Sequence, residues 1–369
     1  MVTEVIDIIL NGSNTGLIFI LNVNQLDEVY FRMEYDIHIK KAVLHILDTS
    51  INFPVFSNRE LELDGEISEF LEKHIAKILE DTNLKKAQFV GEANPARDIC
   101  AAVKNDEGCF LEASSALGGM LFDIMLKNVD ITPADLICCL CYINNEQHLG
   151  ILKLNYKTGF THYVNQQEEG ASNSIIRHKT LLPSDGQKVD EAVLISMETG
   201  QLKLLEKLYE INGAKEYYLS QYIFNCSTDL SDNQKLKIID NVTKKINKKY
   251  YDEDFDKVAK LKKVVSDSIE ENKEIRVEAI AEEIFETNLA VREEYIQEIQ
   301  KAGLKDEAIE IPEKIAEKKF KTHKIKTDTG IEINFPLSYY DNREMIEFYN
   351  NPDGSISIII KNVSKITNK

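Results

Sequence analysis

One apolar run constrains the fold more than any other stretch of the chain. Residues 135–143 (DLICCLCYI) are apolar almost throughout, and Asn144-Asn-Glu146 separates them from a second run at residues 148–155. A short apolar run bounded by turn residues is typical of a strand buried inside a sheet. The two runs therefore predict a hairpin at the centre of a core, with a mostly antiparallel sheet around it.

Helices are expected on the N-terminal side of this hairpin. Residues 64–79 place apolar side chains at i, i+3 and i+4, which is the spacing of an amphipathic helix. Pro95 predicts the start of a second helix, and residues 110–127 predict a third, loosened at Gly118-Gly119. Further strands of the same domain are expected at residues 36–48, 61–63 and 160–164.

A polar stretch at residues 165–174 (NQQEEGASNS) is the best linker candidate. It divides the chain into an N-terminal α+β domain, residues 33–165, and a C-terminal α+β domain, residues 175–369. Residues 1–32 hold two strand-like runs joined by Asn11-Gly12, which predicts a hairpin. The alternative is that the protein begins at Met33 and that residues 1–32 are an upstream extension.

The C-terminal domain is predicted to contain strands, a helical block and a final hairpin. We expect strands at residues 191–197 and 216–224, and a helix or helical turn at 202–209. Block 229–303 should hold four helices, at about residues 231–251 with Ser231 as N-cap, 255–269, 277–285 and 291–302. The basic unit at residues 314–369 should end in a hairpin formed by residues 345–349 and 355–361, because Asp353-Gly354 is a strong turn signal.

Charge is distributed unevenly along the second half. The whole chain carries a net charge of −18, which argues against broad, nonspecific adhesion to nucleic acid. Residues 231–263 nevertheless hold ten lysines against six acidic residues, and residues 314–326 hold six lysines against one. Between these basic blocks, residues 264–313 carry five basic and fifteen acidic residues. Local basic faces therefore remain available, because exposed charges are screened beyond about 8–10 Å at cellular salt.

Two sets of lysines are candidate DNA contacts. On a helix at residues 231–251, Lys237, Lys244 and Lys248 fall on one side, nearly opposite the apolar residues, and could follow a phosphate backbone. A solvated face, or a partner for the acidic block, explains the same row. The second set is Lys319, Lys321, Lys324 and Lys326. Lysines that protect an exposed strand edge are the alternative for this set.

The sequence contains no recognisable catalytic or metal-binding set. A Walker loop, a His-Glu-x-x-His motif, Gly-x-Gly-x-x-Gly and Gly-x-Ser-x-Gly are all absent. Cys138, Cys139 and Cys141 lack the Cys-x-x-Cys spacing, and strand alternation would place Cys138 opposite the other two. His45 and His74 are expected at the edge of the core. We therefore predict a protein without enzymatic activity, metal or cofactor, and no run approaches the roughly 20 apolar residues of a membrane span.

Several segments together resemble a known family. They are residues 40–48 (KKAVLHILD), 70–79 (FLEKHIAKIL), 182–192 (LPSDGQKVDEA), 326–333 (KTDTGIEI) and 351–362 (NPDGSISIIIKN). Their order and spacing resemble the bacterial 37-kDa nucleoid-associated proteins, the NdpA-like family, from about residue 37 to the C-terminus. The resemblance implies a non-enzymatic cytoplasmic protein of the nucleoid that binds double-stranded DNA, and it suggests a type II topoisomerase as a protein partner. It supplies no established binding residues.

Two functions follow as hypotheses. In the first, the chain is a nucleoid-associated protein that contacts DNA phosphates through the lysines named above, with weak sequence specificity. In the second, it is an adaptor that binds a chromosome enzyme such as a type II topoisomerase through acidic residues 264–313. The sequence leaves open the oligomeric state, although a homodimer would double the phosphate-binding surface. It also leaves open any sequence preference on DNA and the physiological partner.

Overall fold

The chain forms two compact units that meet in sequence between Thr228 and Asp229. The computed structural model describes residues 35–167, 170–251, 260–261, 263–265, 267–268, 274–286, 288–305, 308–310, 322–340, 342–352 and 355–365. The hairpin expected within residues 1–32 lies outside these residues, as does most of the helix expected at 255–269. The architecture is α+β, as predicted from the sequence.

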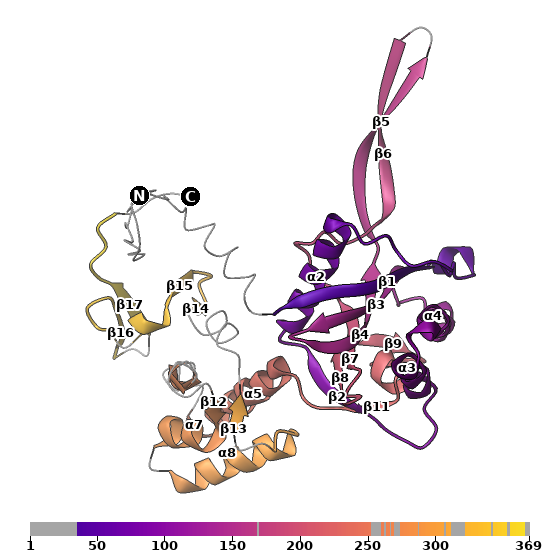
Figure 1. Ribbon diagram of the computed structural model, residues 1–369. Helices are drawn as coiled ribbons and strands as arrows, with labels where there is room; N and C mark the ends of the chain where they lie inside the picture. The colour runs from indigo at the N-terminus through magenta and orange to yellow at the C-terminus, as the bar shows by residue number, and fades with distance from the viewer. Residues whose placement is uncertain are drawn as a thin grey trace, which may run out of the picture. The chain divides into compact units, whose positions relative to one another are not determined.

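The first unit is built on a seven-stranded sheet, antiparallel at every pairing (Figure 1). Its strands, in spatial order, are β1 (Ile37–Leu47), β3 (Ala134–Ile143), β4 (Glu146–Asn155), β7 (Glu191–Ser196), β8 (Leu202–Leu205), β2 (Lys85–Phe89) and β11 (Cys226–Thr228). The predicted hairpin is β3–β4. Asn144 and Asn145 form its turn with φ of 49° and 67°, in the left-handed region that tight hairpin turns require.

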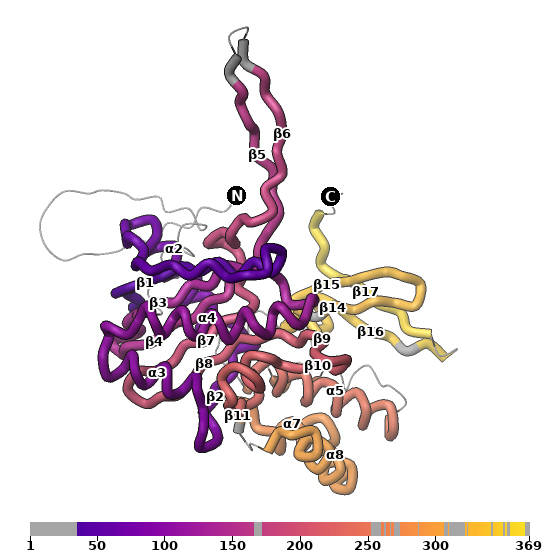
Figure 2. Tube along the Cα trace, turned by 90° about the vertical axis from the view of Figure 1, so that its right-hand side faces the viewer, coloured from indigo at the N-terminus to yellow at the C-terminus, as the bar shows by residue number. Residues whose placement is uncertain are grey.

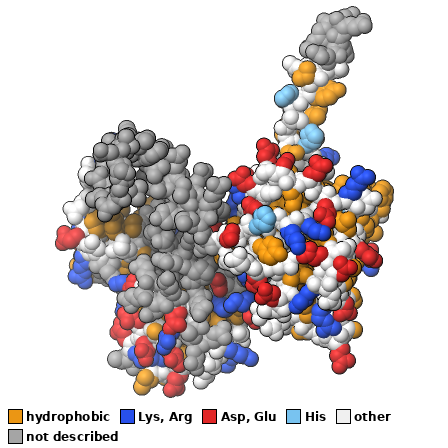
Figure 3. Space-filling view, viewed as in Figure 1, with side chains coloured by type: hydrophobic (Ala, Val, Ile, Leu, Met, Phe, Trp, Pro, Cys, Tyr) orange, Lys and Arg blue, Asp and Glu red, His pale blue; other side chains and the backbone are white. Residues whose placement is uncertain are grey.

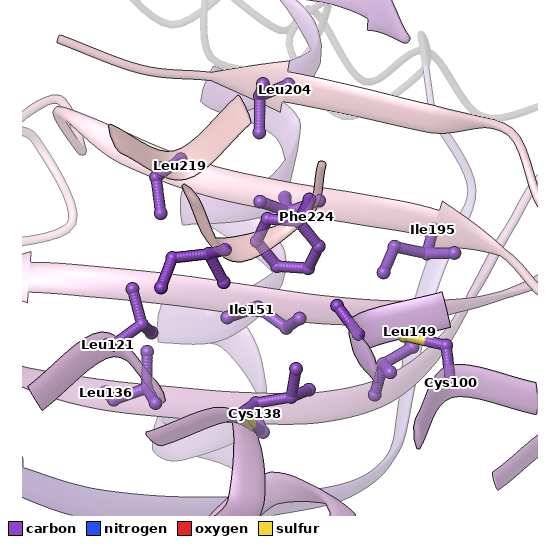
Figure 4. Close-up of a cluster of buried hydrophobic side chains, with 14 of the residues drawn as sticks. Cys100, Leu121, Leu136, Cys138, Leu149, Ile151, Ile195, Leu204, Leu219 and Phe224 are labelled. Carbon is purple, nitrogen blue, oxygen red and sulfur yellow. The ribbon is translucent and has the colours of Figure 1, made fainter. Parts of the chain in front are cut away.

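Helices cover both faces of this sheet, so the unit has three layers (Figure 1). On one face α3 (Pro95–Asn105) and α4 (Phe110–Lys127) pack, together with the helical turn η3 (Leu219–Ile223). On the other face lies α2 (Gly65–Leu79). Figure 4 shows the first of these cores, where Cys138, Ile151 and Ile195 extend from adjacent strands beside Leu121 of α4 and Phe224.

The helices of the first unit begin where the sequence predicts. Asp64 accepts a hydrogen bond from the Ile67 N–H at 2.8 Å and caps α2. Asn94 accepts from the Arg97 N–H at 3.1 Å, and Pro95 occupies the first position of α3. Helix α4 runs continuously through its two glycines, so the predicted loosening there is wrong. Gly118 is buried because Phe56 packs where a side chain would stand.

The expected linker at residues 165–174 is wrong. Residues 165–167 and 170–174 belong to a hairpin formed by β5 (Lys157–Gln167) and β6 (Gly170–Leu181), which projects from the first unit (Figures 1 and 2). We call this hairpin the arm. Polar residues dominate the stretch because the arm is solvated on both faces, which removes the alternation that marks a half-buried strand.

The first unit consequently extends well beyond the expected boundary. Strands β7, β8 and β11 complete the same sheet, so residues 175–228 belong to the first unit rather than to a C-terminal domain. The small strands β9 (Tyr209–Ile211) and β10 (Ala214–Glu216) form a separate hairpin within it. A domain boundary cannot lie at this surface hairpin, because the strands before and after it pair with each other in one sheet.

Three local predictions within the first unit are also wrong. The helix expected at residues 202–209 is strand β8, held between β7 and β2. The strand expected at 216–224 ends at Glu216, and Leu219–Ile223 form the helical turn η3. Residues 61–63 are not a strand, although the Leu61 N–H donates to the Ala42 carbonyl at 2.7 Å. For β8, pairing with both neighbouring strands overrides an ambiguous local pattern.

Histidine and cysteine side chains occupy the two cores. His45 and His74 are fully buried rather than at the core edge. Cys138 packs in the core beside α3 and α4, and Cys139 and Cys141 pack in the core beside α2. The predicted alternation of the three cysteines is confirmed.

The second unit begins with a helical core. Its elements are α5 (Asp232–Tyr251), β12 (Glu274–Arg276), α7 (Val277–Phe285), α8 (Leu289–Lys301) and β13 (Ala308–Glu310). Apolar stripes of α5, α7 and α8 meet around Tyr295 and Phe285, whose ring centroids are 5.2 Å apart. The predicted helices at 231–251, 277–285 and 291–302 correspond to these three elements.

Two short hairpins follow. β14 (Thr322–Lys326) pairs with β15 (Glu332–Pro336), the helical turn η4 (Leu337–Tyr339) comes next, and β16 (Ile346–Asn350) pairs with β17 (Ile356–Ile360). The C-terminal hairpin predicted from the Asp-Gly signal is therefore confirmed, with strands at the expected residues. Phe348 packs near Phe335 and Tyr340, at centroid distances of 6.3 and 5.6 Å.

Candidate nucleic-acid interface

Helix α5 carries the first candidate surface. A capping box closes its N-terminus: the Gln234 N–H donates to Ser231 Oγ at 3.3 Å, and the Ser231 N–H donates to Gln234 Oε1 at 2.9 Å. Leu236, Ile239 and Ile246 recur at helical spacing and are buried in the core of the second unit. Burial of this stripe fixes which side of the helix faces solvent.

Lys237, Lys244 and Lys248 are exposed on the opposite side of α5; we call them the α5 lysine row. About 16 Å of helix separates the first from the last. One strand of duplex DNA presents a phosphate about every 3.4 Å of axis, so the row is long enough to follow several phosphates. Lys244 Nζ lies 2.7 Å from Asp240 Oδ2, an exposed pair of the kind that contributes little to stability.

Two other lysines of α5 attach it to α8. Lys249 Nζ donates to both carboxylate oxygens of Glu294, at 2.7 and 2.9 Å, and Lys245 pairs with Glu298. The hydrogen bond from Lys249 lowers the pKa of Glu294, and the same bond raises the pKa of Lys249. Lys245 and Lys249 thus pair with acidic residues of α8, although both side chains remain exposed.

Strand β14 carries the second candidate surface. Lys324 and Lys326 are exposed, and their Nζ atoms lie 3.8 and 3.3 Å from the two carboxylate oxygens of Glu332 on β15. Both lysines thus lie on one face of the ribbon, as strand alternation predicts. Lys319 and Lys321 lie outside the described residues.

Four of the six cysteines, Cys100, Cys138, Cys139 and Cys141, are buried. Within the described residues, no group of three or more His, Cys, Asp or Glu side chains is arranged to hold a metal ion. All six cysteines are free. Burial raises the pKa of Cys100 to about 12 and raises the pKa of Cys138 as well. A thiol with a raised pKa stays protonated, which makes it a poor nucleophile and a poor metal ligand.

A pocket of about 490 Å³ lies in the first unit beside α3 and β7. Its two cationic side chains already have backbone partners. Arg97 donates to the carbonyls of Gly91 and Glu92, and Lys104 Nζ donates to the Glu198 carbonyl at 2.8 Å. These contacts fix loops against α3, so the pocket offers no free cation for an anionic ligand.

A buried charge network between β4 and β7 is not foreseen by the sequence. Lys153 Nζ donates to Glu191 Oε2 at 2.7 Å and to Asn155 Oδ1 at 2.6 Å, and the Tyr209 hydroxyl donates to the same Glu191 oxygen at 2.8 Å. Lys153 and Glu191 are 2% and 0% exposed at the side chain. Burial lowers the pKa of Lys153, and the Glu191 carboxylate opposes that shift. Because the pair is enclosed, we assign it a structural role.

The arm is the other surface that sequence reasoning missed. Its large apolar side chains are strongly exposed, with Phe160 at 73% and Ile175 at 78%. Figure 3 shows hydrophobic and histidine side chains along its visible side. A signal was present in the sequence, because residues 157–167 and 170–181 contain no Asp or Glu in an otherwise acidic chain.

One stretch of the described residues, Glu107–Lys127, is long and apolar enough to cross a membrane. It comprises the turn η2 (Glu107–Cys109) and α4. Phe110, Leu121 and Met125 of this helix are buried against the sheet. The stretch is therefore a core helix of the first unit.

The fold and its surfaces define an α+β protein whose candidate site consists of exposed lysines, and the described part of the chain holds no group of side chains arranged to bind a metal ion. Residues 43–367 match the model of the family described as nucleoid-associated protein YejK, and the chain belongs to that family. The comparison with curated proteins gave no match.

Proposed function

We propose that this protein binds double-stranded DNA at the nucleoid of a bacterial cytoplasm, without enzymatic activity and mainly through phosphate contacts. Family membership supports the nucleoid association. The single observation that carries the DNA-binding mode is the α5 lysine row, whose three lysines are exposed on the side of the helix opposite its buried stripe. Lys324 and Lys326 on β14 are a second, exposed basic site, to which Lys319 and Lys321 would add.

Lysine contacts to phosphates predict weak sequence specificity and strong salt dependence. A lysine is a compact point charge, and the row contains no Arg, Asn or Gln that would read base edges in pairs of hydrogen bonds. The overall charge of −18 opposes approach to DNA and predicts weak binding. The lysine contacts to phosphates are what should make that binding weaken as salt rises.

The test is duplex-DNA binding by the purified protein across a salt series. Log affinity should fall linearly with log salt, with a slope of about −0.9 per neutralised phosphate. The triple changes Lys237→Gln, Lys244→Gln, Lys248→Gln and Lys321→Gln, Lys324→Gln, Lys326→Gln should each flatten the slope. Absence of binding by the unaltered protein at low salt would remove the basis of this proposal.

A second candidate function is an adaptor for a chromosome enzyme such as a type II topoisomerase. The observation that favours it is the exposed carboxylates of Glu278, Glu282 and Glu283 on α7. An acidic helical surface can attract a basic partner. This function predicts binding of the enzyme in the absence of DNA, weakened when the three glutamates are changed to Gln.

A further inference from the structure

The arm consists of two strands that pair only with each other. β5 and β6 form their own two-stranded sheet, and their register runs from Lys157↔Leu181 to Gln167↔Gly170. Strands of this length extend roughly 35 Å. An isolated two-stranded hairpin is marginally stable in water, because neither face is buried. An arm exposed on both faces therefore indicates a surface that something else covers.

The charge of the arm indicates which kind of molecule covers this surface. Its two strands have 11 and 12 residues, and at the chain's average of 62 acidic residues in 369 they would hold about four acids. They hold none, and they carry Lys157, Arg177 and Lys179 with two histidines. Glu168 and Glu169 lie outside the described residues. The strands are thus a cationic ribbon on an acidic protein, which suits a polyanion.

The two faces of the ribbon differ in character. On one face Phe160 lies opposite Arg177, and His162 lies opposite Ile175. On the other face, hydroxyl and amide side chains predominate; they include Thr161, Asn165, Ser172 and Ser174, beside Tyr163 and Ile176. The exposed side chains therefore combine cations, hydrogen-bonding groups and several apolar groups, of which Phe160 and Ile175 are the most exposed, followed by Tyr163, Val164, Ile176 and Leu181.

We propose that the arm binds duplex DNA as a β-ribbon laid in a groove, and this proposal rests on the DNA-binding function above. The major groove is about 12 Å wide and admits two strands, which lie about 4.8 Å apart. Arg177 and the hydroxyl and amide groups supply phosphate and base-edge contacts. Phe160 and Ile175 supply apolar contact with thymine methyls or enter between base steps. The arm spans about one 34 Å turn of the duplex.

A second copy of the chain could also cover apolar side chains on the arm. The absence of acids and the polar face favour a polyanion instead, since protein interfaces are depleted of charge and rich in apolar contact at their centres. The two occupants predict different behaviour of the arm in the absence of DNA, and the test uses that difference.

The first test places a fluorophore on the arm. The chain has no tryptophan, so Phe160→Trp creates a single reporter at a position that is 73% exposed. Phe53→Trp, at a position 60% exposed in the loop after β1, is the matched control. On titration of the full-length protein with a short DNA duplex, emission from Phe160→Trp should be quenched by the bases and emission from Phe53→Trp should not change.

The second test removes charge from the arm. Arg177→Gln with Lys179→Gln should flatten the salt slope by about 1.8 and weaken duplex binding roughly 10- to 100-fold at about 0.1 M salt. Lys86→Gln with Lys215→Gln removes the same charge from exposed positions elsewhere on the first unit and should change neither quantity.

The outcomes separate this proposal from the function on which it rests. If the unaltered protein fails to bind duplex, both are overturned. Suppose instead that the unaltered protein binds duplex and that changing the α5 lysine row weakens binding. If Phe160→Trp emission then does not change on binding, and loss of the arm charges leaves affinity and salt slope unchanged, only the arm proposal is overturned. If Phe160→Trp emission is already blue-shifted without DNA and depends on protein concentration, the arm binds a second copy and the proposal is also overturned.

Discussion

Lys153 and Glu191 form a salt bridge inside the first unit, where the free energy of an ion pair depends on both partners being present. Changing Lys153→Met leaves the Glu191 carboxylate buried without its cation. We expect a loss of about 3–5 kcal/mol in the unfolding free energy. The double variant Lys153→Met, Glu191→Leu should be more stable than the sum of its single changes predicts. Urea denaturation of the four proteins measures this coupling.

An exposed salt bridge provides the control for this prediction. Lys73 Nζ lies 3.0 Å from Asp185 Oδ2, and both side chains are about half exposed. Lys73→Met should cost no more than about 1 kcal/mol. Equal losses at Lys73 and Lys153, or additive effects in the double-mutant cycle, would contradict the account of the buried pair.

The buried side chain of His45 makes the stability of the first unit depend on pH. The Ser57 N–H donates to Nδ1 at 3.1 Å, so Nε2 carries the proton and donates to Ser114 Oγ at 2.9 Å. Burial lowers the pKa of His45, and it lowers the pKa of His74 as well. A second proton on His45 would break the Ser57 hydrogen bond. Both histidines therefore contribute stability in their neutral forms.

The sign of the effect follows from these lowered pKa values. The unfolded chain takes up protons below about pH 6.5 while the folded chain resists them, so stability is full above that pH and falls below it. We expect each histidine to contribute a loss of up to about 1 kcal/mol one pH unit lower. Urea midpoints on either side of this pH measure it. His45→Gln should reduce the pH dependence, and the exposed His38→Gln should leave it unchanged.

At the scale of elements, two glycines in the first unit respond oppositely to the same change. A Cβ at Gly119 of α4 would meet only Phe56 Cζ, at 4.0 Å, so Gly119→Ala should stabilise the unit by about 0.5–1 kcal/mol through helix propensity. A Cβ at Gly150 of β4 would lie 2.7 Å from Cys139 Sγ, so Gly150→Ala should cost about 1–3 kcal/mol. Thermal unfolding distinguishes the two, and equal signs would contradict this reading of the packing.

Helices and strands could be predicted wherever residues close together in the sequence supply the whole signal. Asp64 and Asn94-Pro95 mark helix starts by hydrogen bonds within a few residues. The leucines of β8, by contrast, satisfy either a helix or a strand, and only pairing with β2 and β7 decides between them. In the arm, the strand predicted at residues 160–164 lies within β5, which is longer than predicted. The polar residues that follow carried no strand signal, because the arm has no buried face.

The candidate site likewise has one feature that local geometry predicts and one that depends on tertiary packing. A helical wheel correctly separates the α5 lysine row from the buried stripe, because helix geometry alone fixes which residues share a side. Which lysines pair with the acidic block depends on where α8 packs. Lys245 and Lys249 are one residue from members of the row, and nothing local distinguishes them until Glu294 and Glu298 are brought alongside.

At the scale of the whole molecule, each unit has its own core, so each should unfold separately. A fragment of residues 35–228 should fold and keep the calorimetric transition of the first unit. A fragment that ends at residue 165 should not fold, because it lacks β7, β8 and β11 of the sheet. Cooperative unfolding of the shorter fragment, or none in the longer one, would contradict the boundary after Thr228.

The strand order of the sheet also determines how long an early strand stays unpaired during synthesis. β2 is among the first strands made, yet its neighbours are β8 and β11, and Ala87 pairs with Leu202 and Thr228. At roughly 5–20 residues per second, β2 waits about 6–23 s for its first partner. During that interval the nascent chain exposes an unpaired strand edge, which invites association with other chains. While the first unit is being synthesised, β2 is therefore a defined segment for chaperones to protect.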